Sequence, residues 1–262
     1  MTSFLELHRP GNPLLLPNPW DAGSARVLAA LGYQALATTS GGFAATLGRL
    51  DGSVSRDEAL AHAANVVAAT ELPVSADLEN GFADDPAGVA QTVTAAISTG
   101  LAGCSIEDAT GRADDPIYAA VLAAERVAAA VEAAGERLVI TARAENHLHG
   151  RDDLADTISR LQSFQEAGAQ VLYAPGLIKP DEIRSVVTSL DRPVNVLALP
   201  GGPTVADLAE LGVARVSVGG AFAYAALGAL VEAAQEFREQ GTYGFWERAG
   251  VGRAIVRDAF TG

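Results

Sequence analysis

The sequence predicts a single-domain α/β protein over residues 1–262, a (β/α)8 barrel of the TIM type with an additional C-terminal helix. Short apolar runs that suit β-strands alternate with Ala-rich helical patterns along the whole chain. The unit recurs eight times, and 262 residues is close to the roughly 250 of such a barrel. An open, doubly wound sheet is the structural alternative, and eight repeated units favour the closed barrel.

Eight runs are expected to form the strands: 13–18, 35–40, 73–79, 103–108, 138–144, 171–176, 194–200 and 214–220. The clearest helical patterns between them cover 56–70, 86–99, 117–134, 152–167, 181–189, 204–211 and 224–240. Ser55 and the pair Asp85-Pro86 stand where helices should begin, and glycines stand where helices should end. The tail is expected to form the extra helix at about 243–260, whose apolar residues need a partner surface.

Composition limits the partners and the compartment. With 32 acidic and 18 basic residues the net charge is −14, which disfavours binding to nucleic acid or to anionic membranes. The only cysteine, Cys104, cannot form an intrachain disulfide, and the N-terminus has no apolar run of signal or membrane-spanning length. We therefore expect a cytoplasmic protein. An anionic substrate would need a local cation in the site, and a metal ion would supply one.

Acidic residues stand where the third and fourth predicted strands end, which is where a barrel places its active site. Strand alternation puts Asp77 and Glu79 on one face, and we expect that face and Glu107 of the next strand to point to the barrel axis. Because these candidate ligands offer only oxygen donors, they favour a hard ion: Mg2+, with Mn2+ as the alternative. Arg143 on the fifth strand could bind an anionic substrate group. Taken singly, each acid could instead be a helix cap or an ion-pair partner of Arg143, but the joint pattern favours a metal site.

The second strand leads into Ser40-Gly41-Gly42, which we interpret as a turn. Because glycine allows close approach, the backbone N–H groups of this turn could bind a substrate carboxylate. Cys104 is expected to face the surrounding helices as a core residue.

At these residues the chain resembles the isocitrate lyase / phosphoenolpyruvate mutase superfamily, from about residue 16 to residue 243. The stretches that carry the resemblance are PNPWDAGSARVLAALGYQALATTSGG (17–42), LGRLDG (47–52), LPVSADLENGFADDP (72–86), GCSIEDATG (103–111), ARAE (142–145), EAGAQVLYAPG (166–176), NVLALPGGP (195–203) and LGVARVSVGG (211–220).

The resemblance implies a Mg2+-dependent barrel that forms an enolate-like intermediate from oxo-acids. It implies that Asp77 binds the metal directly and that Glu79 and Glu107 do so directly or through water. Ser40 and Gly41 would bind the substrate carboxylate, with Gly42 beside them. The remaining implied site residues are Asp51, which would close over the metal site, Arg143, which would bind the far anionic end of the substrate, and Asn195, a further substrate-binding candidate. The resemblance also implies a homodimer or homotetramer in which the C-terminal helix packs on a neighbouring subunit.

The chain departs from parts of the superfamily. Isocitrate and methylisocitrate lyases carry a Lys-Lys-Cys-Gly-His loop after the fourth strand, and this chain has DATGRADDPIYAAV there. The longer gating loop with Lys and Asn, found in mutases and phosphonopyruvate hydrolases, is also missing. After the fifth strand, Arg143-Ala144-Glu145 keeps the arginine of the family pattern. The chain thus resembles a phosphonomutase-like branch without the lyase cysteine loop.

We expect a Mg2+-dependent lyase, a decarboxylase or aldol-type enzyme that cleaves a C–C bond of a small, oxaloacetate-like 2-oxo or 2-hydroxy carboxylate through a metal-stabilised enolate. Loss of CO2 needs no acid beside the leaving group, which suits a chain without the loop cysteine. One alternative is a phosphonopyruvate-type P–C mutase or hydrolase, against which the missing Lys/Asn loop counts. The other is a non-catalytic barrel that binds an oxo-acid, against which the full set of metal-site residues counts.

Overall fold

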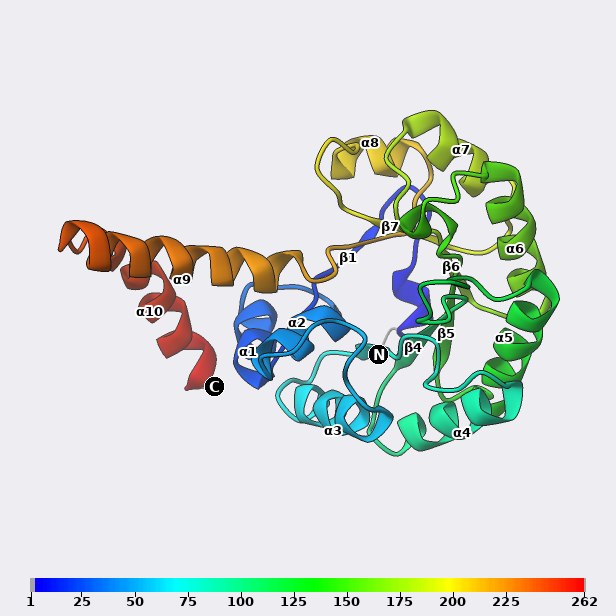
Figure 1. Ribbon diagram of the computed structural model, residues 1–262, viewed down its shortest axis with the longest axis horizontal. Helices are drawn as coiled ribbons and strands as arrows, with labels where there is room; N and C mark the ends of the chain where they lie inside the picture. Colours follow the sequence, from blue (N-terminus) through cyan, green and yellow to red (C-terminus); the bar gives the residue numbers. More distant parts are fainter. Residues whose placement is uncertain (1–2, 262) are drawn as a thin grey trace.

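The computed structural model describes residues 3–261 and shows a barrel of eight parallel strands surrounded by helices (Figure 1). The strands are β1 (Leu14–Leu16), β2 (Leu36–Ala37), β3 (Val74–Asp77), β4 (Gly103–Glu107), β5 (Val139–Arg143), β6 (Val171–Tyr173), β7 (Val194–Leu197) and β8 (Arg215–Ser217). Each lies within its predicted run, and the neighbour order is β1-β8-β7-β6-β5-β4-β3-β2. The predicted barrel is confirmed, and the open doubly wound sheet is excluded.

The barrel is joined between β1 and β2 by a main-chain hydrogen bond and by the side chain of Asn18. The Ala37 N–H donates to the Pro17 carbonyl (3.1 Å), and the Asn18 side-chain amide donates to the Thr38 carbonyl (3.0 Å). The oxygen of the same amide accepts from the N–H groups of Val218 and Gly219, at 3.0 and 2.9 Å. Asn18 therefore connects the ends of β1, β2 and β8.

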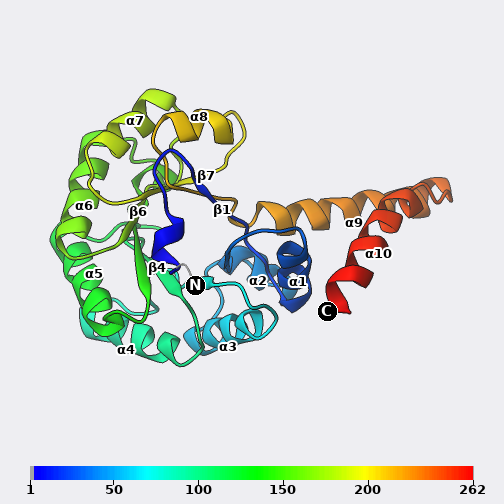
Figure 2. The same cartoon turned by 180° about the vertical axis from the view of Figure 1, so that it is seen from behind.

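The helices surround the strands, as Figures 1 and 2 show from both sides, except for the last two, which extend away from the barrel. The helices are α1 (Ala22–Ala30), α2 (Ser40–Thr46), α3 (Arg56–Val67), α4 (Pro86–Ile97), α5 (Ala120–Ala134), α6 (Leu154–Glu166), α7 (Pro180–Thr188), α8 (Val205–Glu210), α9 (Ala221–Gln240) and α10 (Phe245–Phe260). Ser55 and Asp85 cap α3 and α4 by accepting from backbone N–H groups three residues on, as their sequence positions predict.

The prediction of a turn at 40–42 was wrong, because Ser40 begins the helix α2. Thr39 caps this helix by accepting from the Gly42 N–H at 3.2 Å. Glycine has a low helix propensity, so the two glycines in the first turn of α2 led to the prediction of a turn. Tight packing explains them here: a Cβ on Gly42 would lie 2.5 Å from Thr39 Cγ2.

The hydrophobic core lies between the strands and the helices, while much of the barrel interior is polar. Outward-facing residues such as Ala76, Cys104 and Ile106 pack beneath α3, α4 and α5. Burial raises the pKa of the Cys104 thiol to about 12, which fits the core role expected for it. Barrel interiors are usually filled by branched apolar side chains. Here the buried polar residues on the strands are Ser75, Ser105, Thr141, Asn195, Arg215 and Ser217.

A short N-terminal turn closes the end of the barrel where the strands begin. The 3-10 turn η1 (Leu5–Leu7) is flanked by Phe4, which clusters with Leu14 and Leu16, and by His8. His8 Nε2 lies 3.3 Å from Arg215 Nη1 inside the barrel. The polar interior is thus closed at this end and opens at the carboxyl ends of the strands.

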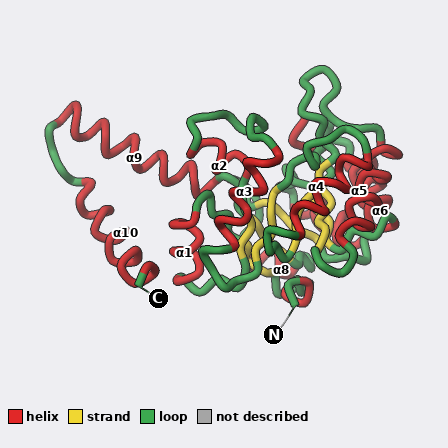
Figure 3. Tube along the Cα trace, turned by 90° about the horizontal axis from the view of Figure 1, so that it is seen from below, coloured by secondary structure: helices red, strands yellow, loops and turns green. Residues whose placement is uncertain are grey.

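Helices α9 and α10 form an arm that leaves the barrel, as Figure 3 shows from below. The arm carries exposed apolar side chains: Leu230, Val231, Phe237, Trp246 and Val251. Helix α10 returns to α1, where the Phe260 ring lies 3.6 Å from the position that a Cβ on Gly23 would occupy. None of the residues of α10 is buried. The extra C-terminal helix is present, and its packing on a neighbouring subunit stays a prediction.

Among residues 3–261 no helix combines the length and the apolar character that crossing a bilayer requires.

Candidate active site

A pocket of about 790 Å3, counted to its open mouth, lies at the carboxyl ends of the strands. Four predicted site residues line it: Ser40, Asp51, Asp77 and Arg143. Glu79 and Glu107 line an adjoining opening, which shares Ser40, Asp51 and Arg143 with the pocket. The structure therefore brings all the predicted acids of the site to one end of the barrel.

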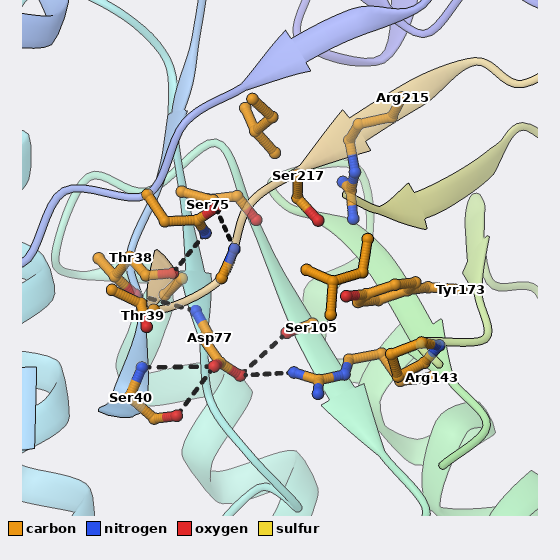
Figure 4. Close-up of a pocket in the computed structure, with 18 of the residues that line it drawn as sticks. Thr38, Thr39, Ser40, Ser75, Asp77, Ser105, Arg143, Tyr173, Arg215 and Ser217 are labelled. Atoms are coloured by element: carbon orange, nitrogen blue, oxygen red, sulfur yellow. Dashed lines mark hydrogen bonds and ion pairs between the residues drawn. The ribbon is translucent and has the colours of Figure 1, made fainter. Parts of the chain in front are cut away.

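Asp77 is the most highly connected side chain in the pocket (Figure 4). Its carboxylate accepts from the Ser40 hydroxyl (3.1 Å) and the Ser40 N–H (3.4 Å), and from the Ser105 hydroxyl (3.4 Å). Arg143 Nη1 lies 3.0 Å from the Asp77 carboxylate. These contacts hold the carboxylate facing the pocket.

Arg143 binds three carboxylates of the protein itself. Besides Asp77, its Nη2 lies 3.1 Å from Glu107 and its Nε lies 2.8 Å from Glu145. Burial alone would lower the pKa of Arg143, but Glu107, Glu145 and Asp77 together raise it well above its usual range. The guanidinium predicted to bind the far end of a substrate is thus engaged with the acids in this structure.

Negative charge is in excess around Arg143. Burial, and then the charges of Asp77 and Asp51, raise the pKa of Glu79 to about 7. Burial also raises the pKa of Glu107 well above its usual range. Carboxylates that resist ionisation in this way are stabilised by a nearby cation.

Asp77, Glu79 and Glu107 fit a divalent ion that keeps part of its water shell. Within residues 3–261 no three acidic, histidine or cysteine side chains form a preformed metal cluster. Mg2+ is commonly held by one or two carboxylates together with several waters, so a ready cluster is not needed. Asp77 could bind directly, and Glu79 and Glu107 could bind through water.

The loop after β3 is held in a strained conformation by Arg126, a residue that the sequence analysis missed. Glu79 and Phe82 have positive φ values of 48° and 55°, which side chains other than glycine rarely adopt. Arg126 of α5 donates to the carbonyls of Ala83, Asn80 and Asp84, the last at 2.6 Å. An arginine on the buried face of an Ala-rich helix was the available signal.

Asp108 and Arg160 were also missed, and they position the loop after β5. Asp108 accepts from the Glu145 N–H at 2.8 Å and from Arg160 Nη1 at 3.2 Å. Burial raises the pKa of Asp108 to about 6. Arg160 thus holds Asp108, and Asp108 holds the backbone of Glu145 beside Arg143.

The remaining predicted residues lie around or beneath the pocket. A Cβ on Gly41 would lie 3.0 Å from Asp51 Oδ2, so this glycine allows Asp51 to approach α2. Gly42 is buried behind it. Asn195 does not reach the pocket wall: its amide donates to Ser217 Oγ (3.0 Å), and its carbonyl accepts from Arg215 Nε (2.9 Å). It supports two residues that do line the pocket.

The chain is a parallel barrel whose acids and arginine gather at the carboxyl ends of β3, β4 and β5, the end at which barrel enzymes place their active sites. Residues 4–238 match the sequence model of the phosphoenolpyruvate phosphomutase family, and the chain belongs to this family. The predicted membership of the isocitrate lyase / phosphoenolpyruvate mutase superfamily is thereby confirmed. The superfamily is enzymatic, with lyase and mutase members.

Three similar proteins illustrate the range of this superfamily. A crystal structure of a candidate lyase/mutase from Burkholderia cenocepacia J2315 is 54% identical, with a TM-score of 0.92, over 97% of this chain and 93% of that one. The 2-methylisocitrate lyase of Escherichia coli is 30% identical over 72% of this chain and 70% of its own length. The oxaloacetate decarboxylase of Pseudomonas entomophila is 29% identical over 85% of this chain and 78% of its own.

Proposed function

We propose that the protein is a Mg2+-dependent lyase that cleaves a C–C bond of a small, oxaloacetate-like 2-oxo or 2-hydroxy carboxylate. The observation that carries the proposal is the group of Asp77, Glu79 and Glu107 at one pocket mouth, where burial and mutual repulsion raise the pKa values of both glutamates. Mn2+ is the alternative ion, because it accepts the same oxygen donors.

Each part of the site has a task in this reaction. The bound ion would supply an electrophile that stabilises negative charge developing on the 2-oxygen of the substrate. The Ser40 hydroxyl, next to Asp77, would bind the adjacent carboxylate of the substrate. Once the acids are neutralised, Arg143 could turn part of its guanidinium toward the substrate. Asp51 stands at the open side of the pocket, where it could close over the bound substrate.

Two considerations favour C–C cleavage over the alternatives. The relatives at 30% and 29% identity are named 2-methylisocitrate lyase and oxaloacetate decarboxylase. The segment after β4 lacks the Lys and Asn residues of the gating loop associated with P–C chemistry. The family name supports the second candidate, a phosphonopyruvate-type mutase or hydrolase. A non-catalytic oxo-acid-binding barrel is the third.

A product assay on the purified protein tests the proposal. Oxaloacetate, 2-methylisocitrate and phosphonopyruvate would be incubated with Mg2+, with Mn2+ or with EDTA, and pyruvate, CO2 and phosphate would be measured. We expect metal-dependent pyruvate from a carbon substrate, without phosphate. Pyruvate with phosphate would instead show a hydrolase, and binding without any product would show the non-catalytic barrel.

A matched pair of variants tests the metal site itself. Asp77→Asn should lower the metal-dependent rate by at least about 100-fold, because the direct ligand loses its charge. Asp114→Asn removes the same charge from an exposed loop position and should leave the rate within about twofold. Equal rates in the two variants would exclude Asp77 as a metal ligand.

We further propose that the protein forms a homodimer or homotetramer through the α9–α10 arm, whose apolar side chains are exposed in the single chain. Large exposed apolar patches usually mark interaction sites. The cytoplasmic location expected from the sequence stays a prediction that cell fractionation would test.

A further inference from the structure

Arg215 is a buried cation on the wall of the pocket, and its partners are all neutral. It is the first residue of β8 and only 4% of its surface is exposed. Its hydrogen-bond partners are the Asn195 carbonyl (2.9 Å), the Thr141 hydroxyl (3.1 Å) and His8 Nε2 (3.3 Å). Among residues 3–261 no carboxylate forms a salt bridge with it, whereas Arg143 has three.

The partners of Arg215 cannot compensate its charge. Burial and the nearby Arg215 charge lower the pKa of His8 to about 3, so the imidazole is neutral at pH 7. Burial lowers the pKa of Arg215 itself, but only to about 10, so the guanidinium is charged. A buried charge that lacks a partner of opposite sign is unfavourable, because it has lost its hydration. An anion that enters the pocket would compensate much of this loss.

The walls around Arg215 offer the rest of a carboxylate-binding site. Ser217, Ser105 and Tyr173 line the same pocket. Figure 4 shows Arg215, Tyr173 and Arg143 in succession along one wall, with Asp77 across from Arg143. The metal-binding end, with Asp77 and Arg143, and Arg215 therefore line one and the same pocket.

We propose that Arg215 binds a second carboxylate of the substrate, at the end away from the metal. The site would then select 2-oxo and 2-hydroxy acids with two or more carboxylates over monocarboxylates that share the same head. Charge-assisted hydrogen bonds from a guanidinium suit this task, because the fork of N–H donors matches the two oxygens of a carboxylate. The proposal rests on the proposed function for the orientation of the substrate.

Binding titrations with matched ligands test this selectivity. The diacids 2-oxoglutarate and 2-oxoadipate are compared, in the presence of Mg2+, with 2-oxopentanoate and 2-oxohexanoate, which lack the second carboxylate. Oxalate serves as a probe of the metal end alone. We expect at least one diacid to bind tenfold or more tightly than its monocarboxylate counterpart. A preference below threefold for both pairs would overturn the proposal, and this result needs no variant.

Two variants separate recognition from support of the fold. Arg215→Met should reduce the diacid preference to threefold or less while oxalate affinity changes by less than threefold. Arg215→Lys keeps a charge and should keep part of the preference. An unchanged preference in folded Arg215→Met would show that Arg215 only supports the barrel, and would overturn the proposal. If oxalate shows no Mg2+-dependent binding, the proposed function fails, and the diacid preference still decides the role of Arg215.

Discussion

Arg126→Met is expected to lower the free energy of unfolding by about 3 kcal/mol, because the guanidinium holds the loop after β3. Its side chain is 1% exposed, reaches three backbone carbonyls and lies 4.0 Å above the Tyr118 ring. A hydrogen bond to a charged group contributes about 1.5–3 kcal/mol and a cation–π contact about 1 kcal/mol. Burial of the guanidinium opposes part of this sum, since burial lowers the pKa of Arg126.

Because the backbone of this loop is strained, Arg126→Met should change the conformation of the loop as well as the stability of the whole protein. Glu79 and Phe82 hold positive φ values that cost roughly 1 kcal/mol or more each. Without Arg126 the loop can relax and its carbonyls can bind water. Urea unfolding would measure the loss of stability, and amide hydrogen exchange over residues 79–84 would measure the release of the loop.

A control variant sets the scale. Arg137→Met removes an exposed arginine just after the same helix, whose side chain donates to the Ala133 carbonyl at 3.1 Å. It should cost less than about 0.5 kcal/mol. If Arg126→Met costs no more than this control and exchange over 79–84 does not change, then Arg126 does not hold the loop.

Other contacts in the structure lead to three more expected outcomes. Arg143→Met removes the cation shared by Asp77, Glu107 and Glu145, and should lower the free energy of unfolding by about 3–5 kcal/mol in EDTA. Mg2+ should restore part of this loss, and a loss that Mg2+ leaves unchanged would count against the metal site. The His62 ring is stacked on the Phe43 ring with the centroids 3.9 Å apart, and burial lowers the pKa of His62 from 6.5 to about 4. Below pH 6.5 the unfolded chain therefore binds a proton at His62 that the folded chain does not bind. The free energy of unfolding should fall by about 3 kcal/mol between pH 6.5 and pH 4. His62→Leu should remove this part of the pH dependence in urea titrations, and an equal wild-type-minus-variant difference at pH 7 and pH 4.5 would contradict it. Trp246→Glu with Val251→Glu on α10 should dissociate the proposed oligomer in sedimentation velocity, whereas a monomeric wild type would refute the assembly.

The sequence was sufficient for the barrel because alternating buried runs and helix-capping residues are local signals. All eight strands lie inside their predicted runs, but β3 ends at Asp77 rather than Glu79. The difference arises where Glu79 takes up a positive φ and leaves the strand. Helix α2 escaped prediction because its two glycines have low helix propensity, and the close packing that explains Gly42 involves Ala223, which is distant in the sequence.

The site was predictable only in part, for the same reason. The acids Asp77 and Glu107 are the last residues of β3 and β4, so their places in the sequence were enough to group them, whereas Glu79 reaches the site from the loop after β3. The sequence could not show how the cations are distributed among them, because that depends on contacts between strands. Arg143 is held by three acids, whereas Arg215, on a strand far away in the sequence, has only neutral partners among the described residues.

The way Asn18 joins the ends of β1, β2 and β8 has a consequence for how the barrel fluctuates. Elsewhere around the circle, neighbouring strands are held by continuous main-chain ladders, but at this junction one side-chain amide carries much of the connection. Transient opening of the barrel should therefore begin between β1 and β2. Such a split would expose two unpaired strand edges beside the pocket, and Asn18 opposes it together with the main-chain hydrogen bond from Ala37 to Pro17.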